Sequence, residues 1–344
     1  MQEALRPWRN PVHRQSMMFN SPFQAAAGLG QRHLQTLLPT FLHAGSRFRG
    51  ISQELTLPDG DFVDLTWSRI PEPEDERPVV VIFHGLEGSV DSPYALDMMR
   101  SLRQRGWHGV VMHFRGCSGR PNRLARSYHS GATEDARYLL QWLRERYPHA
   151  PLAAVGYSLG GNMLLKLQAE LGADSPLSAA VSVSAPICLD LCADRIRQGF
   201  SRVYQHHLLR RMKQKLLIKY PLHDYETLIG LRRRDVRRLN DFWSFDDAYT
   251  APMHGFRDVN DYYARASARQ YLGAIRKPAL LVHALDDPFM PPKVIPEPSE
   301  LAPDTELELS RHGGHVGFMS GTLIRPRPWL PSRLTDYLAD YLKN

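Results

Sequence analysis

The chain has 344 residues, of which 43% are hydrophobic and 23% are charged. This composition is typical of a soluble globular protein. The length suits one large domain with an insertion. No apolar stretch of about 18 residues or more occurs, so the sequence predicts no membrane-spanning helix. The formal net charge is +7, but residues 190–240 hold thirteen Lys or Arg against five Asp or Glu. The basic character therefore belongs to one segment and is not a nucleic-acid signature of the whole protein.

The N-terminus and the cysteines both favour a cytoplasmic protein. The first residues carry charges and prolines and lack an apolar run of about 7–15 residues, so we expect no secretory signal peptide. Three cysteines, Cys117, Cys188 and Cys192, are an odd and sparse set for a disulfide framework, and their spacing does not suit a zinc site. We expect no metal or other cofactor.

Strand and helix patterns alternate along most of the chain. Four prolines interrupt residues 1–50, for which we expect an irregular arm that packs on the core. Residues 52–69 alternate around Asp59-Gly60, which predicts a hairpin. Apolar runs that suit buried strands then take turns with amphipathic stretches that suit helices. The predicted strands are 79–83, 109–114, 152–156, 179–184, 279–284 and 305–309, and the predicted helices are 92–105, 132–147, 158–171 and a last one around Leu334–Leu342.

This alternation predicts an α/β fold with a mostly parallel sheet and helices on both faces. The alternation lapses between about 190 and 265, where aromatic, Arg and His residues are frequent. We therefore assign residues 51–189 and 266–344 to the α/β core, and residues 190–265 to a basic, aromatic-rich helical cap.

A single G-x-S-x-G motif, Gly156-Tyr-Ser158-Leu-Gly160, lies between a predicted strand and a predicted helix. This is the context of a nucleophile elbow, in which a tight turn exposes the serine hydroxyl above the sheet. The alternative is an ordinary turn with an N-capping serine. The context favours Ser158 as the nucleophile of an α/β-hydrolase fold.

A serine hydroxyl needs a base, and in this fold the acid and then the histidine follow the serine along the chain. Only two of the fifteen histidines, His312 and His315, lie beyond the strand at 279–284. A glycine-flanked loop carries His315, which favours it as the general base. Asp286 and Asp287 both follow that strand, and the proline after them favours Asp287 as the acid.

Two backbone amides are candidates for an oxyanion hole. Leu159 follows the nucleophile, and Leu86 lies in His84-Gly-Leu-Glu-Gly-Ser89, directly after the strand at 79–83. We expect His84 to be buried and to hold this loop through a side-chain hydrogen bond.

Four fragments together resemble the YheT-like esterases, a branch of the α/β hydrolases. They are Gly30-Gln-Arg-His-Leu-Gln-Thr36, His84-Gly-Leu-Glu-Gly-Ser89, Phe114-Arg-Gly-Cys-Ser-Gly119 and Gly156-Tyr-Ser-Leu-Gly-Gly-Asn162. The resemblance spans nearly the whole chain and implies that Ser158, Asp287 and His315 form a charge-relay triad. That family includes carboxylesterases for short or medium acyl chains, phospholipase-like eukaryotic relatives and yeast alcohol acyltransferases.

The favoured function is hydrolysis of short- to medium-chain or lipid-like esters through an acyl-Ser158 intermediate. Acyl transfer to an alcohol and thioester hydrolysis would use the same residues, so the sequence leaves these alternatives open. A scaffold that binds nucleic acid through its basic cap is a more distant alternative. We expect an ester substrate, no nucleic acid and no obligate protein partner.

Two further expectations concern the cap. The segment 200–219 is basic and partly amphipathic, so it either contacts anionic membranes or carries solvated charges. Its apolar and aromatic side chains either line an acyl pocket or pack on one another. These candidates are Phe200, Tyr204, Leu208, Met212, Leu216, Phe242, Trp243, Phe245 and Tyr249.

Overall fold

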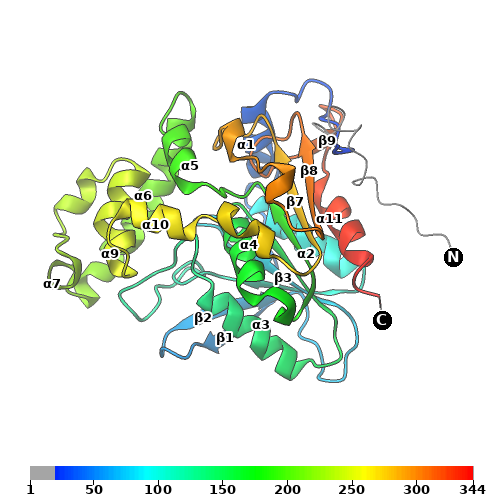
Figure 1. Cartoon of the computed structure of the whole chain (residues 1–344), viewed down its shortest axis with the longest axis horizontal. Coiled ribbons are helices and arrows are strands. Elements are labelled where there is room, and N and C mark those ends of the chain that lie inside the picture. The colour runs from blue at the N-terminus through cyan, green and yellow to red at the C-terminus, as the bar shows by residue number, and fades with distance from the viewer. Residues whose placement is uncertain (1–19, 344) are drawn as a thin grey trace.

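The structure, a computed structural model, describes residues 20–343. The first 19 residues of the arm, with the expectation that they hold no signal peptide, lie outside the described residues. A central eight-stranded sheet has the order β1-β2-β4-β3-β5-β6-β7-β8, and Figure 1 shows helices on both sides of it. The strands are β1 (Ile51–Thr56), β2 (Phe62–Trp67), β3 (Val79–Phe83), β4 (His108–Met112), β5 (Leu152–Tyr157), β6 (Leu177–Val183), β7 (Ala279–Ala284) and β8 (Thr305–Ser310).

The sheet is parallel from β4 to β8, and β1 and β2 extend it as an antiparallel hairpin. The predicted hairpin, the six predicted core strands and the mostly parallel sheet are confirmed. The helices are α1 (Arg32–Leu42), α2 (Pro93–Gln104), α3 (Glu134–Arg146), α4 (Leu159–Leu171), α5 (Leu189–Ile196), α6 (Ser201–Lys219), α7 (Tyr225–Ile229), α8 (Phe242–Phe245), α9 (Ala251–Met253), α10 (Val259–Ala266) and α11 (Leu330–Ala339).

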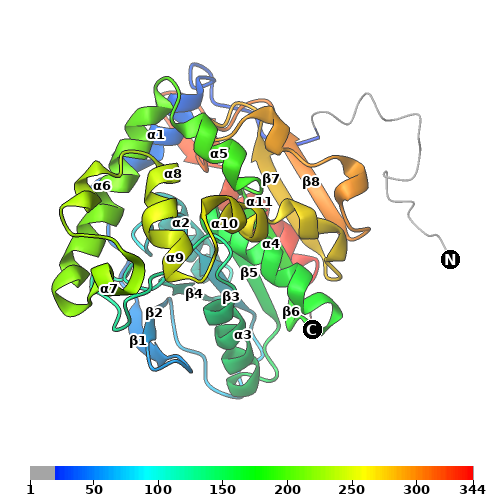
Figure 2. The ribbon, with the colours of Figure 1, turned by 60° about the vertical axis from the view of Figure 1, so that its left-hand side comes forward.

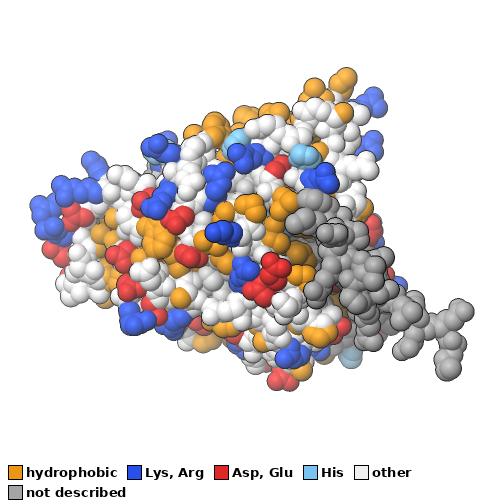
Figure 3. All heavy atoms as spheres, turned by 45° about the horizontal axis from the view of Figure 1, so that its top comes forward, with side chains coloured by type: hydrophobic (Ala, Val, Ile, Leu, Met, Phe, Trp, Pro, Cys, Tyr) orange, Lys and Arg blue, Asp and Glu red, His pale blue; other side chains and the backbone are white. Residues whose placement is uncertain are grey.

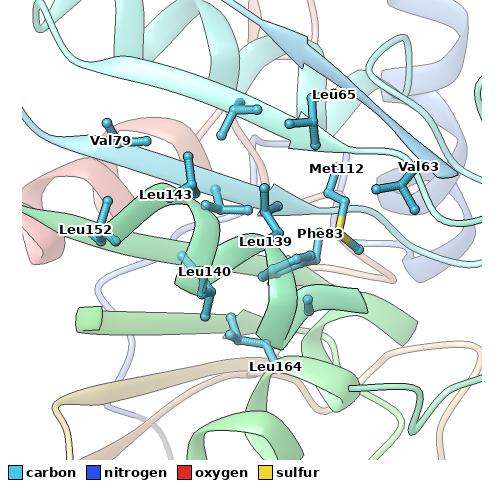
Figure 4. Close-up of a cluster of buried hydrophobic side chains, with 14 of the residues drawn as sticks. Val63, Leu65, Val79, Phe83, Met112, Leu139, Leu140, Leu143, Leu152 and Leu164 are labelled. Carbon is cyan, nitrogen blue, oxygen red and sulfur yellow. The ribbon is translucent and has the colours of Figure 1, made fainter. Parts of the chain in front are cut away.

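Both faces of the central strands are buried, because helices cover both sides of the sheet. Successive side chains of a strand point to opposite faces, so they enter two different clusters. In β3, Val79 and Phe83 join the hydrophobic cluster under α3 and α4, and Val80 and Ile82 join the cluster under α2 and α11. Figure 4 shows the first cluster, with side chains of α3 against those of β3 and β4. Figure 2 shows α3 and α4 in front of the sheet and α11 behind it. These layers hold the carboxyl ends of the strands in place.

The arm differs from its prediction, because residues 32–42 form the helix α1. The Gln31 side chain caps this helix by accepting a hydrogen bond from the Leu34 N–H at 2.8 Å. Pro39 lies inside this helix, where it removes one intrahelical hydrogen bond without ending the helix. The prolines therefore do not break the helix as expected, since tertiary contacts outweigh local propensity. The short strands β9 (Met319–Gly321) and β10 (Pro326–Pro328), which pair beside the arm, had no clear signal.

Helices α5 to α10 lie between β6 and β7 in the chain, and Figures 1 and 2 both show α6, α7 and α9 gathered at one side of the sheet. The helical character expected for residues 190–265 is confirmed, and the domain boundaries stay a prediction. The expected amphipathic pattern of α6 is wrong. Its buried positions include Ser201, Gln205 and Lys219 beside apolar residues, so no apolar stripe runs along it.

Lys219 anchors the end of α6 to the core. Its ammonium group donates hydrogen bonds to the side-chain oxygen of Asn122 at 2.8 Å and to the carbonyls of Ala125 and Arg126 at 3.1 Å. Within residues 20–343, no helix is long and apolar enough to cross a membrane. The same residues contain no group of three or more His, Cys, Asp or Glu that could hold a metal ion.

Candidate active site

Ser158 lies in a strained turn between β5 and α4. Its backbone has φ 51° and ψ −119°, a conformation that residues other than glycine rarely adopt. The turn needs glycines beside it, because a Cβ at Gly160 would lie 2.4 Å from the carbonyl oxygen of Phe83. This geometry is the one expected of a nucleophile elbow, and Ser158 lines a large cavity.

The structure brings the three predicted triad residues together. The His315 Nε2 lies 2.9 Å from the Ser158 Oγ, and the His315 Nδ1 lies 2.8 Å from an Asp287 carboxylate oxygen. Asp287 is buried, and its other oxygen accepts the Phe289 N–H at 2.8 Å. The Phe289 ring stacks on the imidazole with 4.0 Å between ring centroids. The ring and the carboxylate together orient the imidazole so that Nε2 faces the hydroxyl.

The two alternatives, Asp286 and His312, lie beside this chain of hydrogen bonds and not in it. Asp286 accepts the Gly314 N–H at 2.9 Å and lies 3.5 Å from the His312 Nδ1. Burial raises the pKa of the Asp286 carboxyl above its usual value. The His312 side chain is 53% exposed. Asp286 therefore supports the loop that carries His315, and His312 points largely to solvent.

The two predicted oxyanion donors both line the cavity that holds Ser158. The N–H groups on either side of Leu86, those of Gly85 and Glu87, donate to tyrosine hydroxyls at 2.8 Å. For the Leu86 N–H itself, the described part of the chain offers no acceptor. Leu159 is the first residue of α4, where an N–H has no partner inside the helix. Both amides are thus available to a ligand oxygen.

His84 supports the oxyanion loop as expected. Its Nδ1 donates to the Gly85 carbonyl at 2.7 Å, and its Nε2 accepts the Phe114 N–H at 3.1 Å. Burial lowers the pKa of His84 to about 3, so the ring is neutral. The predicted side-chain hydrogen bond to the loop is confirmed.

Helix α1 contributes contacts that the sequence did not reveal. The Thr36 hydroxyl accepts the His315 N–H at 3.0 Å. The buried Gln35 side chain accepts the Met319 N–H and donates to the Met319 carbonyl at 3.1 Å. A Cβ at Gly317 would lie 2.0 Å from the Gln35 carbonyl oxygen, so glycine is needed for α1 to approach this loop. The motif at 30–36 was visible, but only the fold shows that it positions His315.

Asn162, at the end of the elbow motif, is a second residue whose role was missed. Its amide nitrogen donates to the carbonyls of Ser130 at 2.9 Å and Ala266 at 2.8 Å. Its oxygen accepts the Ala268 N–H at 2.9 Å. These three bonds attach the last residues of α10, and thus one end of the cap, to the nucleophile helix.

Glu87 links the oxyanion loop to the cap. This buried residue has φ 58°, and its carboxylate lies 2.8 Å from the Lys215 ammonium of α6. The Tyr128 hydroxyl accepts the Glu87 N–H and donates to the same carboxylate at 3.0 Å. The motif at 84–89 therefore supports both the candidate oxyanion donor and the position of α6.

The cavity over Ser158 has a volume of about 520 Å³ and lies between the core and the cap helices. The predicted acyl-pocket residues divide into two groups. Those that line the cavity are Phe200, Tyr204, Leu208, Met212 and Phe242. Those that pack elsewhere in the cap are Leu216, Trp243, Phe245 and Tyr249. For this second group the other alternative holds, because these side chains pack on one another in the interior of the cap.

A family model of the alpha/beta hydrolase fold matches residues 78–322. The chain belongs to the alpha/beta hydrolase family. This match confirms the predicted fold class, and it includes the Ser158 elbow, both candidate acids and both candidate histidines.

Individual relatives give a closer comparison than the family model. The hydrolase is 50% identical to "Putative esterase YheT" of Escherichia coli over 94% of this chain and 95% of that one, which confirms the resemblance to YheT-like proteins. It is 29% identical to "Phospholipase ABHD3" of Mus musculus over 85% of this chain and 72% of that one. A structure of the Pyrococcus furiosus esterase Pf2001 shares the fold, with a TM-score of 0.52, 18% identity and coverage of 86% and 94%. The chain is an enzyme of the esterase and lipase type.

Proposed function

We propose that this hydrolase cleaves carboxylic esters through an acyl-enzyme on Ser158, with His315 as general base and Asp287 as the acid of the triad. The observation that carries the proposal is the continuous chain of hydrogen bonds from Ser158 Oγ through the imidazole to Asp287, with distances of 2.9 and 2.8 Å. Such a chain activates a hydroxyl that is otherwise a weak nucleophile.

The geometry supports a two-step reaction. As Ser158 Oγ attacks the ester carbonyl, His315 Nε2 takes the hydroxyl proton, and the N–H groups of Leu86 and Leu159 receive the negative oxygen. The imidazolium then gives the proton to the departing alkoxide, which leaves as an alcohol. Water attacks the acyl-enzyme with the same base, and the carboxylic acid and free Ser158 are released.

An acyl or lipid-like ester fits the cavity best, because apolar and aromatic side chains form most of its wall. The relatives support an ester substrate: their names describe an esterase, a phospholipase and, in Saccharomyces cerevisiae, a monoacylglycerol lipase that is 28% identical over 77% of this chain and 60% of that one. Thioester hydrolysis and acyl transfer to an alcohol would pass through the same acyl-enzyme and stay alternatives.

Contact with anionic membranes through the cap stays a prediction that rests on charge alone. Figure 3 shows Lys and Arg side chains at the cap end of the molecule. The exposed apolar side chains are Val203 and Ile218 of α6 and Phe200 directly before it, and they lie near the two ends of the helix. An interfacial helix needs a continuous apolar face. The cytoplasmic location and the absence of a nucleic-acid partner also stay predictions.

The test is labelling by a fluorophosphonate probe together with hydrolysis of p-nitrophenyl butyrate. Ser158→Ala should abolish labelling and lower kcat by about 10⁴-fold or more. Ser130→Ala is the matched control, because Ser130 lines the same cavity and, within residues 20–343, forms no hydrogen bond with Ser158, Asp287 or His315. The control should keep its labelling. Labelling of the Ser158→Ala protein would assign the nucleophile to another residue.

A further inference from the structure

A buried carboxylate outside the triad, that of Asp246, lines the cavity over Ser158 from the cap side. Only 8% of this residue is exposed. One oxygen accepts a hydrogen bond from the Thr250 hydroxyl at 2.6 Å, and the other accepts one from the Tyr263 hydroxyl at 2.8 Å. No Lys, Arg or His among residues 20–343 forms an ion pair with it. Asp246 therefore meets two neutral donors and no positive charge.

This arrangement lowers the free energy of unfolding when no ligand is bound. A buried carboxylate needs hydrogen bonds and usually a counter-charge, because it has lost its hydration. Burial raises the pKa of Asp246 to about 6, so the group is still mostly ionised near neutral pH. An uncompensated charge beside a catalytic cleft is a feature of functional sites more than of structural ones.

Aromatic rings surround this end of the cavity. Tyr262 and Tyr263 line it with 5.2 Å between their ring centroids, and Phe242 lines it as well. His129 lies 5.4 Å from the Tyr262 ring, and burial holds the pKa of His129 well below its usual range, so this ring is neutral. Aromatic faces next to a carboxylate are the surroundings in which proteins bind organic ammonium groups.

The backbone at Asp246 is also unusual. Residues Asp246–Thr250 form a π-helical turn between α8 and α9. Such turns are rare and are found frequently at functional sites. Here the turn brings the Asp246 carboxylate and the Thr250 hydroxyl together on the cavity wall.

Hydrogen bonds connect this region to the nucleophile. The Tyr262 hydroxyl accepts the Ser130 N–H at 3.1 Å, and the Ser130 carbonyl accepts a hydrogen bond from the Asn162 side chain at 2.9 Å. Asn162 in turn donates its N–H to the Ser158 carbonyl at 3.1 Å. The aromatic end of the cavity is thus held at a fixed place relative to Ser158.

We propose that Asp246, Thr250, Tyr262 and Tyr263 form a subsite that binds a positively charged ammonium group of the ester substrate. The inference rests on the proposed function, because it takes the cavity at Ser158 as the place where the ester binds. The ammonium group lies against the carboxylate and the ring faces, and the ester carbonyl reaches Ser158. A neutral group of the same shape fills the subsite without the electrostatic attraction.

Two pairs of isosteric esters test the proposal and locate the ammonium group. Butyrylcholine and 3,3-dimethylbutyl butyrate differ in the charge of the alcohol part. The p-nitrophenyl esters of 4-(trimethylammonio)butanoate and 5,5-dimethylhexanoate differ in the charge of the acyl part. In at least one pair, kcat/KM for the charged ester should exceed that for its neutral partner by about 10- to 30-fold.

Asp246→Asn should lower this charged-to-neutral ratio to about one, mainly through a higher KM for the charged ester. The ratio is measured within one protein, so a partial loss of folded enzyme cancels. Asp247→Asn is the matched control, because it removes the same charge from an exposed neighbour on the same turn. The control should keep the wild-type ratio.

Three results would overturn the subsite: a wild-type ratio near one in both pairs, an unchanged ratio in Asp246→Asn, or an equal fall in Asp247→Asn. Failure of the proposed function is distinct, because then Ser158 is not labelled and no ester is cleaved. In that case binding of tetramethylammonium, measured by calorimetry on wild type and Asp246→Asn, still decides the subsite. Loss of binding in the variant supports it, and equal binding overturns it.

Discussion

Two buried carboxylates lie near one cavity and differ in what opposes their charge. Asp246 lines the cavity from the cap, and Asp287 lies behind His315, which lines it from the core. Asp287 has the imidazole of His315 at 2.8 Å, whereas Asp246 has two hydroxyl groups. The first carboxylate is paired within the protein and directs a proton acceptor toward Ser158. The second is free to attract a charged ligand. We therefore propose that the core wall of the cavity, with Ser158 and His315, carries the chemistry, and that the cap wall, with Asp246, selects the substrate.

The largest expected effect separates the two adjacent acids of the core wall. Asp287→Asn should lower kcat for p-nitrophenyl butyrate by about 10⁴-fold, because it removes the group that sets the imidazole tautomer. Asp286→Asn is the control and should cost less than about tenfold, since Asp286 accepts the Gly314 N–H and, within residues 20–343, forms no hydrogen bond with the imidazole of His315. Similar losses in the two variants would mean that both carboxylates support the imidazole.

The next largest effect is on the free energy of unfolding, and it comes from Asp246 in the cap. Burial raises the pKa of Asp246 from 3.8 to about 6 in the folded state, so the folded protein binds more protons than the unfolded chain between these pH values. The free energy of unfolding should therefore fall as the pH rises through this range, and stay low above it. A shift of this size corresponds to at most about 3 kcal/mol.

Urea unfolding of wild type and Asp246→Asn at several pH values from 4 to 7 measures this effect. The difference in free energy of unfolding, wild type minus variant, should decrease as the pH rises. A difference that does not change with pH would show that the Asp246 charge is compensated in the folded protein, and it would weaken the contrast with Asp287.

The smallest effect concerns the apolar part of the cap wall. Each added CH₂ that the cavity buries contributes about 0.8 kcal/mol, or about a fourfold rise in kcat/KM, until the cavity is full. Leu208→Ala should reduce this rise along a series of p-nitrophenyl esters from acetate to octanoate, because Leu208 lines the cavity. Leu228→Ala, an exposed leucine of the cap, should leave it unchanged. A flat wild-type series would contradict an acyl role for the cap.

The strands, the Ser158 elbow and the candidate acids and histidines after it can be found without a structure. Strands β3 and β5 are continuous apolar runs because both of their faces are buried, and such runs are visible without a structure. The Ser158 motif between a strand and a helix, followed by an acid and a histidine, reflects local backbone geometry and chain order. These features are visible in the sequence, and they limited the candidates to two acids and two histidines.

Tertiary structure alone decided which of these residues meet and what the rest of the cavity wall is. Asp286 and Asp287 are adjacent in the chain, and only the packing of the two loops puts Asp287 against the imidazole. The Thr36 contact with His315 joins segments that lie far apart in the sequence. Likewise, only the fold places Asp246 on the wall of the cavity that holds Ser158. Hydrophobic periodicity says that a side chain is buried, but not against which partner. For that physical reason Phe200 and Trp243 looked alike in the sequence, although only Phe200 lines the cavity.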